Sequence, residues 1–274
     1  MAVDDDGHGG QEAAIVTPMT AGITPMILTY DEEPNIGRVL ERLAWATEIL
    51  IVDSFSTDAT LNIARSFPSV RILQRKFDSF ARQCNFGLEH VTSPWVLSLD
   101  ADYLLSEEFV RELEALIPGQ ETAGYRAAFR YCIAGRPLRA TLYPPRTVLY
   151  RTGKAKYRDE GHSHHVEIDG SVQPLQSVIY HDDRKPLDRW LAEQNRYMIA
   201  ESQHLLAASF HELNFQDRLR RGIVIAPFVV FLYTLLARGL ILDGWRGWFY
   251  VAQRTLAELL LSLRLAEATF HRRH

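Results

Sequence analysis

Residues 95–102, WVLSLDAD, place two carboxylates directly after an apolar segment. The apolar letters are typical of a short buried strand, and Asp100 and Asp102 then stand at its carboxyl end. Alternate carboxylates at a strand end attract a divalent cation, and hard oxygen ligands favour Mg²⁺ or Mn²⁺ shared with substrate phosphates. Taken alone, such a triplet is equally typical of a solvated loop, so its neighbours in the fold decide its meaning.

Two earlier segments have the same form. Residues 23–29, ITPMILT, lead into the cluster Tyr30-Asp31-Glu32-Glu33, and residues 48–52, EILIV, end at Asp53. Parallel α/β sheets bind ligands outside the carboxyl ends of their strands. We therefore expect three acidic clusters to converge on one edge of a sheet, and this convergence favours a ligand site over a solvated loop.

Helical patterns separate these strands. The spacing of apolar residues predicts helices over 35–45, 80–90 and 106–117, and a further one after residue 57, with Ser56 or Thr57 as its cap. Strand and helix in alternation predict an α/β fold with a mostly parallel, Rossmann-like sheet flanked by helices. Further strands are predicted after this part of the chain, at 125–133, 147–151, 166–168 and 172–180.

Composition and net charge exclude several classes of protein and of binding partner. The chain has 274 residues, of which 47% are hydrophobic and 23% charged, and this excludes a disordered chain or a small disulfide scaffold. A net charge of −4 gives no bulk attraction to nucleic acid. We predict a disordered tail over 1–20, a catalytic α/β domain over 21–183 and an amphipathic helical region over 184–274.

The side chains at the predicted edge suit a nucleotide. Tyr30 offers a ring for base stacking, Glu32 offers a carboxylate for ribose hydroxyls, and Asp53 can accept a hydrogen bond from a nucleobase N–H. Asp58 and Thr60 lie in the turn after Asp53 and are interpreted as helix-capping residues.

Four ordered motifs resemble glycosyltransferase family 2: TYDEEPNI, IVDSFSTDAT, ARQCNFGLE and LSLDADY, within residues 29–103. The resemblance implies a GT-A fold, a nucleotide-diphosphate sugar donor with uridine as the default base, a divalent cation, and inversion at the anomeric carbon. By the matching positions it implies that Tyr30, Glu32 and Asp53 contact the nucleoside. Asp100 and Asp102 then lie at the ribose, the diphosphate and the metal.

The remaining motifs resemble a bacterial branch related to lipopolysaccharide-core β-glucosyltransferases: YPPRTVLYR, YRDEGHSHHV, YHDDRKPLDRW and the segment 240–265. The branch implies a lipid-linked or cell-envelope glycan acceptor and a place at the cytoplasmic side of the bacterial inner membrane. The sequence departs from the branch at Tyr103, where an acid is usual, and at Ser163, which follows His162 in place of a glutamate.

Several residues are candidates for the remaining chemistry. The base that takes the acceptor proton is predicted to be Glu160 or His162, with Asp159 in reserve. His181 is interpreted either as a metal or diphosphate contact or as a structural histidine. A further set of basic residues is interpreted either as ion pairs at the surface or as contacts to phosphate. These residues are Arg82, Arg139, Arg146, Arg184 and Lys185. The histidines around His162 are not expected to form a hydrolytic metal site, because no metal-binding helix motif accompanies them.

The end of the chain is apolar, aromatic and basic. Residues 184–274 hold 13 Lys and Arg against 8 Asp and Glu, a balance of +5, whereas residues 1–183 hold 17 against 26, a balance of −9. Tryptophan and tyrosine among arginines are typical of a helix at a membrane interface. The alternatives are a helical subdomain that closes the core and a dimer interface.

Two other functions compete with sugar transfer. A sugar nucleotidyltransferase would need a Gly-rich basic loop after its first strand to hold a triphosphate, and residues 29–35, TYDEEPN, are acidic instead. A non-catalytic, membrane-associated protein that keeps the nucleotide-sugar pocket is the second alternative, and the departures at Tyr103 and Ser163 leave it open.

Overall fold

The fold was described from a computed structural model, which covers residues 18–160, 163–209, 211 and 213–271. The side chains of Glu160, Ser163, His164 and His271 also lie outside this description. The predicted tail, 1–20, falls mostly outside these ranges. Its end does not, because Met19–Gly22 form a 3-10 helix (η1) in which Thr20 is buried.

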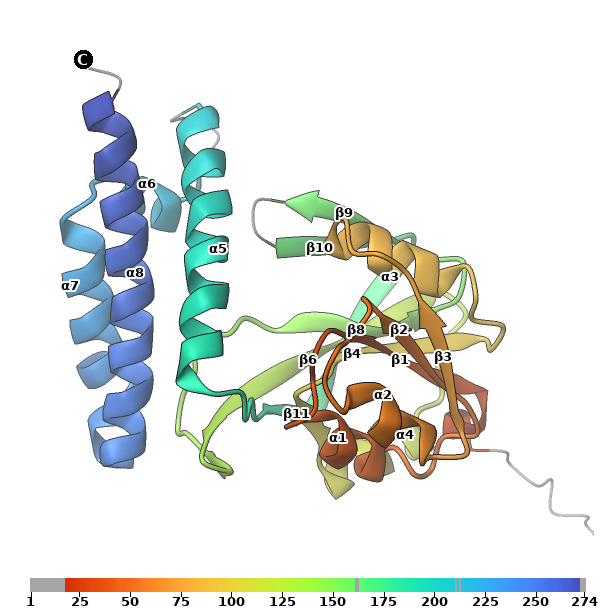
Figure 1. Cartoon of the computed structure of the whole chain (residues 1–274). Helices are drawn as coiled ribbons and strands as arrows, with labels where there is room; N and C mark the ends of the chain where they lie inside the picture. Colours follow the sequence, from red (N-terminus) through yellow and green to blue (C-terminus); the bar gives the residue numbers. More distant parts are fainter. Residues whose placement is uncertain (1–17, 161–162, 210, 212, 272–274) are drawn as a thin grey trace, which may run out of the picture.

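A mixed sheet forms the centre of the described chain (Figure 1). Its strands follow the order β3-β2-β1-β4-β8-β6-β11-β5, and a short strand, β7, pairs with β6. Their bounds are β1 (Ile23–Thr29), β2 (Ile49–Asp53), β3 (Val70–Gln74), β4 (Trp95–Asp100), β5 (Tyr103–Leu105), β6 (Thr122–Ile133), β7 (Arg136–Pro137), β8 (Arg146–Arg151) and β11 (Ser171–His181). A separate antiparallel hairpin consists of β9 (Ala155–Glu160) and β10 (Ser163–Ile168).

The α/β prediction is confirmed, but the expectation of a mostly parallel sheet is wrong, because the second half is mixed: β6 and β11 are parallel, and its other pairings are antiparallel. Strands β3, β2, β1 and β4 are parallel, whereas β8 runs antiparallel to both β4 and β6, and β5 runs antiparallel to β11. Helices α1 (Ile36–Arg42), α2 (Thr60–Arg65) and α3 (Phe80–Leu88) return the chain between the first four strands. No α-helix of the described chain lies between β6 and β8, so the chain has no crossover helix there and the two strands meet antiparallel.

Different layers cover the two faces of the parallel strands (Figure 1). Helices α1, α2 and α4 (Glu107–Ala115) pack on one face, where the core includes the strand residues Ile27, Ile51 and Leu99. Helix α3 and the β9–β10 hairpin cover the other face, where Met26 and Leu50 are buried. Neighbouring strand residues therefore enter opposite cores, which follows from the two-residue period of a strand.

Helix α2 begins later than the sequence predicted. Ser56 and Thr57 were the expected caps, but the Ser56 hydroxyl donates to Asp53 Oδ1 at 2.5 Å. Helix α2 starts at Thr60, whose backbone N–H donates to Asp58 Oδ1 at 3.0 Å. Asp58 therefore provides the hydrogen-bond acceptor that this first N–H lacks within the helix. Ser106 does cap α4 as predicted, because its hydroxyl accepts a hydrogen bond from the Phe109 N–H at 3.1 Å.

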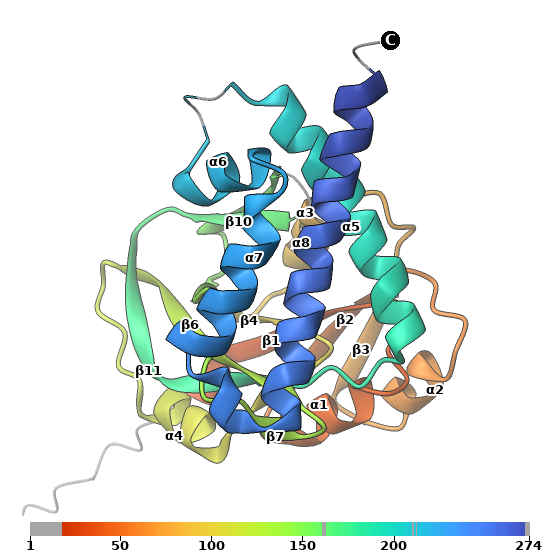
Figure 2. The same cartoon turned by 90° about the vertical axis from the view of Figure 1, so that its left-hand side faces the viewer.

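The chain is helical from Leu187 onward, and Figure 2 shows these helices side by side. They are α5 (Leu187–Ala207), α6 (Phe215–Arg221), α7 (Ile225–Leu232), the π-helical turn η2 (Tyr233–Ala237), the 3-10 turn η3 (Leu240–Asp243) and α8 (Trp245–His271). Leu205 of α5 shares a small core with Leu261 and Leu265 of α8. None of the described helices combines the length and the apolar character needed to cross a bilayer.

Gly247 fixes the contact between α8 and η3, and its replacement is expected to loosen that contact. A Cβ at this position would lie 1.8 Å from the backbone oxygen of Leu240. The Gly247→Ala variant should therefore lose about 1–3 kcal/mol of unfolding free energy, measured by urea denaturation.

Gly37→Ala is the matched control, because Gly37 is also helical and its Cβ would lie 3.4 Å from Ile63 Cγ2. This variant should unfold at the wild-type urea concentration or above it, since alanine favours a helix by up to about 1 kcal/mol relative to glycine. Equal stability of the two variants would contradict the packing argument.

Candidate active site

Three neighbouring parallel strands end level with one another and carry the predicted site. Thr29 of β1 pairs with Asp53 of β2, and Leu28 of β1 pairs with Asp100 of β4. The loops that follow these strands hold Tyr30 to Glu33 and Asp102. The predicted convergence of three acidic clusters on one edge of the sheet is therefore confirmed.

Asp53 is fully buried and lies at the centre of a hydrogen-bond network. Its carboxylate accepts from the Thr29 hydroxyl at 2.9 Å, the Ser56 N–H at 2.9 Å and the Gln74 amide at 3.1 Å. Ser56 Oγ in turn accepts from the Asp31 N–H at 2.8 Å. The loops after β1 and β2 are thereby joined into one surface, and Asp53 holds that surface in place.

Tyr30 presents an exposed ring beside this network, with 48% of its surface accessible. Arg189 of α5 donates to the backbone carbonyls of Tyr30 and Asp31, and its guanidinium lies 6.0 Å from the centre of the Tyr30 ring. Asp31 has a positive φ of 52°, which turns the chain sharply after β1. The ring is accessible for stacking, as the sequence predicted, and α5 fixes the loop that carries it.

Asp102 and His181 form a buried ion pair. His181 Nε2 lies 3.2 Å from Asp102 Oδ2, and His181 ends β11, which pairs with β5 directly after Asp102. Burial alone would raise the pKa of Asp102, but the charges of His181 and Lys185 outweigh it and lower the pKa. Burial opposes the protonation of His181, yet the neighbouring Asp102 raises its pKa above the usual value.

The pair leaves two polar atoms free for a ligand. Asp102 Oδ1 and His181 Nδ1 are buried and have no hydrogen-bond partner among the described residues. Unpartnered buried oxygens are costly unless a ligand, ion or water satisfies them. Within the described ranges no group of three or more His, Cys, Asp and Glu side chains has the geometry to hold a metal ion by itself. A cation here would share its shell with a ligand, as a diphosphate-bound Mg²⁺ or Mn²⁺ does.

Lys185 connects the cluster after β1 with the cluster after β4. Its buried ammonium donates to Glu32 Oε1 at 2.9 Å and lies 3.5 Å from Asp183 Oδ1 and 4.0 Å from Asp102 Oδ2. Burial raises the pKa of Glu32 to about 7 despite the nearby charge of Lys185. Asn35 adds hydrogen bonds from its amide to Glu32 Oε2 and Asp183 Oδ1, both at 2.9 Å. Lys185 therefore lies within 4.0 Å of three carboxylates at the edge of the sheet, one of which, Asp102, also pairs with His181.

An aromatic cluster lines the other side of His181. The His181 ring centre lies 4.7 Å from that of Tyr131, 5.1 Å from Tyr143 and 5.3 Å from Tyr103. The Tyr103 and Tyr143 hydroxyls are hydrogen-bonded to each other. Tyr103 thus fills the position where the family branch usually has an acid, and it packs as part of this aromatic cluster. Burial and the charge of Asp100 raise the pKa of Tyr143.

Other predicted site residues lie apart from this cluster or outside the description. Arg82 is largely exposed on α3, and its guanidinium lies 3.3 Å from Asp78 Oδ2. Asp159 Oδ1 accepts a hydrogen bond from the Ala81 N–H at 3.1 Å, at the start of α3. The Glu160 side chain and His162 lie outside the described residues, so their predicted role as the base stays a prediction.

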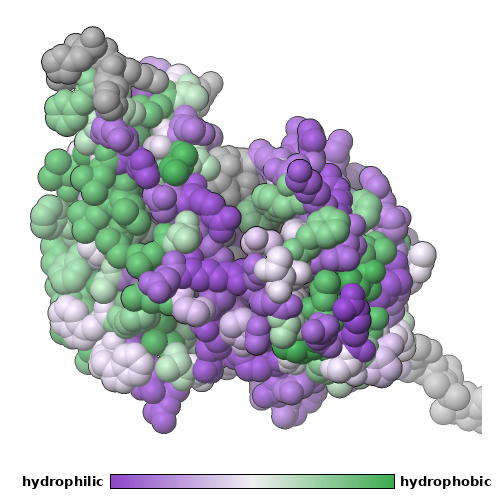
Figure 3. Space-filling model, in the orientation of Figure 1, coloured by the Kyte–Doolittle hydropathy of each residue, from purple (hydrophilic) through white to green (hydrophobic). Residues whose placement is uncertain are grey.

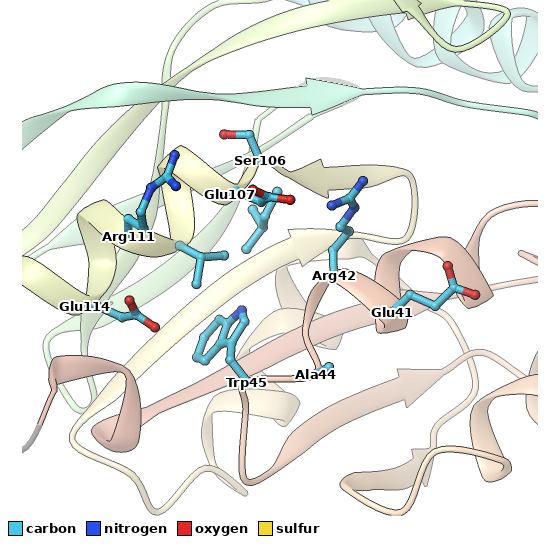
Figure 4. Close-up of a pocket in the computed structure, with 10 residues that line it drawn as sticks. Glu41, Arg42, Ala44, Trp45, Ser106, Glu107, Arg111 and Glu114 are labelled. Carbon is cyan, nitrogen blue, oxygen red and sulfur yellow. The ribbon is translucent and has the colours of Figure 1, made fainter.

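A pocket of about 350 Å³ lies elsewhere, between α1 and α4 (Figure 4). Trp45 forms part of its wall, and its mouth carries charged side chains of both signs, including Arg42, Glu107 and Arg111. None of the site residues predicted from the sequence lines it. The candidate active site is therefore the edge formed by the strand ends, and this pocket is separate from it.

Sequence reasoning missed two contributors. Lys185 was one of several possible phosphate partners, and Arg189 was not singled out. Both follow β11 by a few residues, and only the pairing of β11 beside β5 brings them back to the loops after β1. The signal that pointed toward Lys185 was the charged cluster 182–185, DDRK, directly after a strand.

Similar proteins include enzymes of sugar transfer. The lipopolysaccharide core biosynthesis glycosyltransferase LpsC of Rhizobium meliloti is 30% identical over 191 residues, which are 64% of this chain and 68% of LpsC. The glycosyltransferase SunS of Bacillus subtilis is 26% identical over 68% of this chain and 46% of SunS. Among solved structures, S. aureus TarS in complex with UDP-GlcNAc aligns with a TM-score of 0.47 and 16% identity over 91% of each chain.

The family comparison covers the strand ends of the candidate site. The model for "Glycosyl transferase family 2" matches residues 26–172, which are more than half of the chain and include most strands of the sheet but only the first two residues of β11. The matched region includes Tyr30, Asp53 and Asp102. Its α/β arrangement, with a mixed sheet and flanking helices, is GT-A-like. The chain therefore belongs to glycosyltransferase family 2 and is a glycosyltransferase.

Proposed function

We propose that the protein transfers a sugar, with inversion, from a nucleotide-diphosphate donor to a hydroxyl of a lipid-linked or cell-envelope glycan acceptor. The observation that carries this proposal is the meeting of Tyr30, Asp53 and Asp102 at one edge of the sheet, on three neighbouring strand ends. An aromatic ring, a fixed carboxylate and a partly unpartnered acid are what a base, its ribose and a diphosphate with its cation require. Uridine is the proposed base.

The donor side of the site is held rigidly. Tyr30 offers its ring for stacking, and the hydrogen bonds to Asp53 fix the surface beneath it. Glu32 and Asp100 border the same edge and are proposed to contact the ribose. Arg82 is exposed on α3 and is proposed to contact the donor when it is bound. Preorganised polar groups lower the cost of ordering the site on binding.

Asp102 and His181 fit a divalent cation, Mg²⁺ or Mn²⁺. Asp102 Oδ1 is buried without a partner, and carboxylate oxygen is the ligand type these ions favour. When bound, the ion would stabilise negative charge on the departing diphosphate. Asp102 and His181 would hold it, and Lys185, 4.0 Å from Asp102 Oδ2, adds positive charge at the same place.

The reaction is a direct displacement. The acceptor oxygen forms a bond to the anomeric carbon, and the bond from that carbon to the diphosphate oxygen breaks on the opposite face. The electron pair leaves with the diphosphate. A base takes the acceptor proton, and Asp159, Glu160 and His162 of the β9–β10 hairpin are the proposed candidates. Because Asp159 already accepts a hydrogen bond from Ala81, Glu160 and His162 are preferred.

The acceptor proposal rests on the relative LpsC, whose name assigns it to lipopolysaccharide core biosynthesis. Lipid-linked acceptors of this kind are reached at a membrane surface, so we place the protein at the cytoplasmic side of the bacterial inner membrane. Tight donor binding without transfer to any acceptor would instead favour a non-catalytic, nucleotide-sugar-binding protein.

Asp102→Asn tests the proposed metal and diphosphate site. We expect transfer from a UDP-sugar, measured with Mn²⁺ as release of UDP in the presence of a lipopolysaccharide-core acceptor, to fall by about 10²–10³-fold. Asp169→Asn is the control, because Asp169 is exposed and its carboxylate pairs with Lys154, away from the strand ends of the candidate site. Undiminished turnover of Asp102→Asn would falsify the assignment.

Tyr30→Ala tests base stacking. Loss of the ring should weaken UDP binding, measured by calorimetry, by about 1–3 kcal/mol, because stacking of a base on an aromatic ring contributes about this much. Phe270→Ala removes an exposed ring near the end of α8 and should leave the Kd of UDP unchanged. If both variants bind UDP like the wild type, Tyr30 does not contact the base.

Mn²⁺ affinity in the presence of UDP should rise with pH. The raised pKa of His181 means that it holds a proton above pH 6.5, and this proton must leave before the ring can bind a metal. The log of the association constant should increase by up to about one per pH unit until the pKa of His181 is passed. His181→Gln should flatten this slope, whereas a wild-type affinity that is constant from pH 6 to 8 would contradict the metal role of His181.

A further inference from the structure

Helices α7 and α8 share an apolar surface that no described part of the chain covers. On α7 and η2 the exposed residues recur every three or four positions, and a second stripe on α8 begins with Trp245, Trp248 and Phe249. Figure 3 shows hydrophobic side chains gathered at the left-hand edge of the molecule, over these helices. We call this surface the α7–α8 face, and its residues are Phe228, Val229, Leu232, Tyr233, Leu236, Ile241, Leu242, Trp245, Trp248 and Phe249.

The exposure of this face is large for apolar side chains. Phe228 is 67% exposed, Leu242 is 68% exposed and Trp245 is 58% exposed. Helix α7 and η2 present this stripe although their opposite side already packs against α8, through the core that includes Phe231 of α7, Leu235 of η2 and Val251 of α8. Contiguous exposed apolar surface of this kind marks a site of interaction.

Two arginines flank the face, and acids are almost absent from it. Between Arg218 and Ala257 the only acidic residue is Asp243, which lies 3.2 Å from the guanidinium of Arg139. Arg238 and Arg246 flank the apolar stripe, and Arg246 lies 4.6 Å from the ring centre of Trp245. A rim of arginines around tryptophans and phenylalanines complements a surface that is apolar inside and negatively charged outside.

We propose that the α7–α8 face lies in the headgroup region of a bilayer that contains anionic phospholipid, with α7 and α8 in the plane of the membrane. The aromatic side chains enter the interface and the arginines contact lipid phosphates. This inference deepens the proposed function, on which it rests for the lipid-linked nature of the acceptor.

The charges disfavour a second copy of the chain as the occupant. A symmetric dimer through this face would place the arginine rims of two copies against each other. Within the segment 218–257 the single acid, Asp243, already pairs with Arg139, so the rim offers no counter-charge. Anionic lipid supplies that counter-charge.

The proposed orientation brings the membrane close to the active site. Tyr250 of α8 points inward, and its ring centre lies 5.0 Å from that of Tyr131, which is 4.7 Å from His181. The neighbouring residues Trp248 and Phe249 point outward. Tyr131 and Tyr250 thus connect the candidate metal pair with α8, the helix whose outer side contributes to the α7–α8 face.

The test is cosedimentation of the full chain with vesicles, without donor or acceptor. The protein should bind vesicles of phosphatidylcholine with phosphatidylglycerol at least tenfold more tightly than phosphatidylcholine alone, and salt should weaken this binding. The combined variant Trp245→Ala, Trp248→Ala, Phe249→Ala should lose at least tenfold in vesicle affinity. Ile117→Ala is the matched control, because Ile117 is 90% exposed on the other side of the molecule, after α4.

Calorimetric binding of UDP and far-ultraviolet circular dichroism report whether the variant is folded. The proposal is overturned if the folded triple variant binds vesicles like the wild type, or if the wild type binds neither vesicle. It is also overturned if sedimentation velocity shows a wild-type dimer that the triple variant loses, because the occupant is then a second copy. Vesicle binding is measured without sugar transfer. The proposal of membrane binding and the proposal of sugar transfer can therefore be contradicted independently of each other.

Discussion

The parallel register of β2, β1 and β4 is the constraint on which the site depends. Because Thr29 stands opposite Asp53 and Leu28 opposite Asp100, the three strands end together and their loops must share one edge. The apolar residues of these strands enter two cores, one on each face, and a slip by one residue would reverse which side chains are buried. The same packing that stabilises the sheet therefore aligns the acids at its end.

Gathering carboxylates at one edge has an electrostatic cost, and the chain offsets it from a distant segment. His181 is the last residue of β11, and Lys185 follows it by four residues. These two residues nevertheless provide the positive charge for Asp102 and Glu32 near the ends of β4 and β1. Buried charges are tolerated when they are paired and hydrogen-bonded. The lowered pKa of Asp102 keeps this carboxylate ionised, which is the form that a divalent cation requires.

The sequence alone was sufficient to predict the features that depend on a local pattern of residues. Strand 23–29 was predicted with its observed bounds, and the acids at the strand ends followed from it. The antiparallel pairings of β8 were not predictable in the same way, because the direction of β8 depends on which distant strands it joins. The contacts of Lys185 with Glu32 and of Arg189 with Tyr30 could not be predicted for the same reason, because each joins residues about 150 positions apart in the sequence. The candidate base residues Glu160 and His162 remain predictions from the sequence alone.

The segment between β11 and α5 is bonded along its whole length. The Asp182 N–H donates to the Asp102 carbonyl at 3.0 Å and its carboxylate accepts from Arg38 at 2.7 Å, while the Arg184 N–H donates to Asn35 Oδ1 at 2.9 Å. Because these hydrogen bonds fix the connection to the sheet domain, it holds α5 in place and does not act as a hinge. If the helices rest on lipid as proposed, the height of the sugar-transfer site above the bilayer is set by the fold. Selection among acceptors would then depend on how far their free hydroxyl stands from the lipid, as well as on the shape of the sugar.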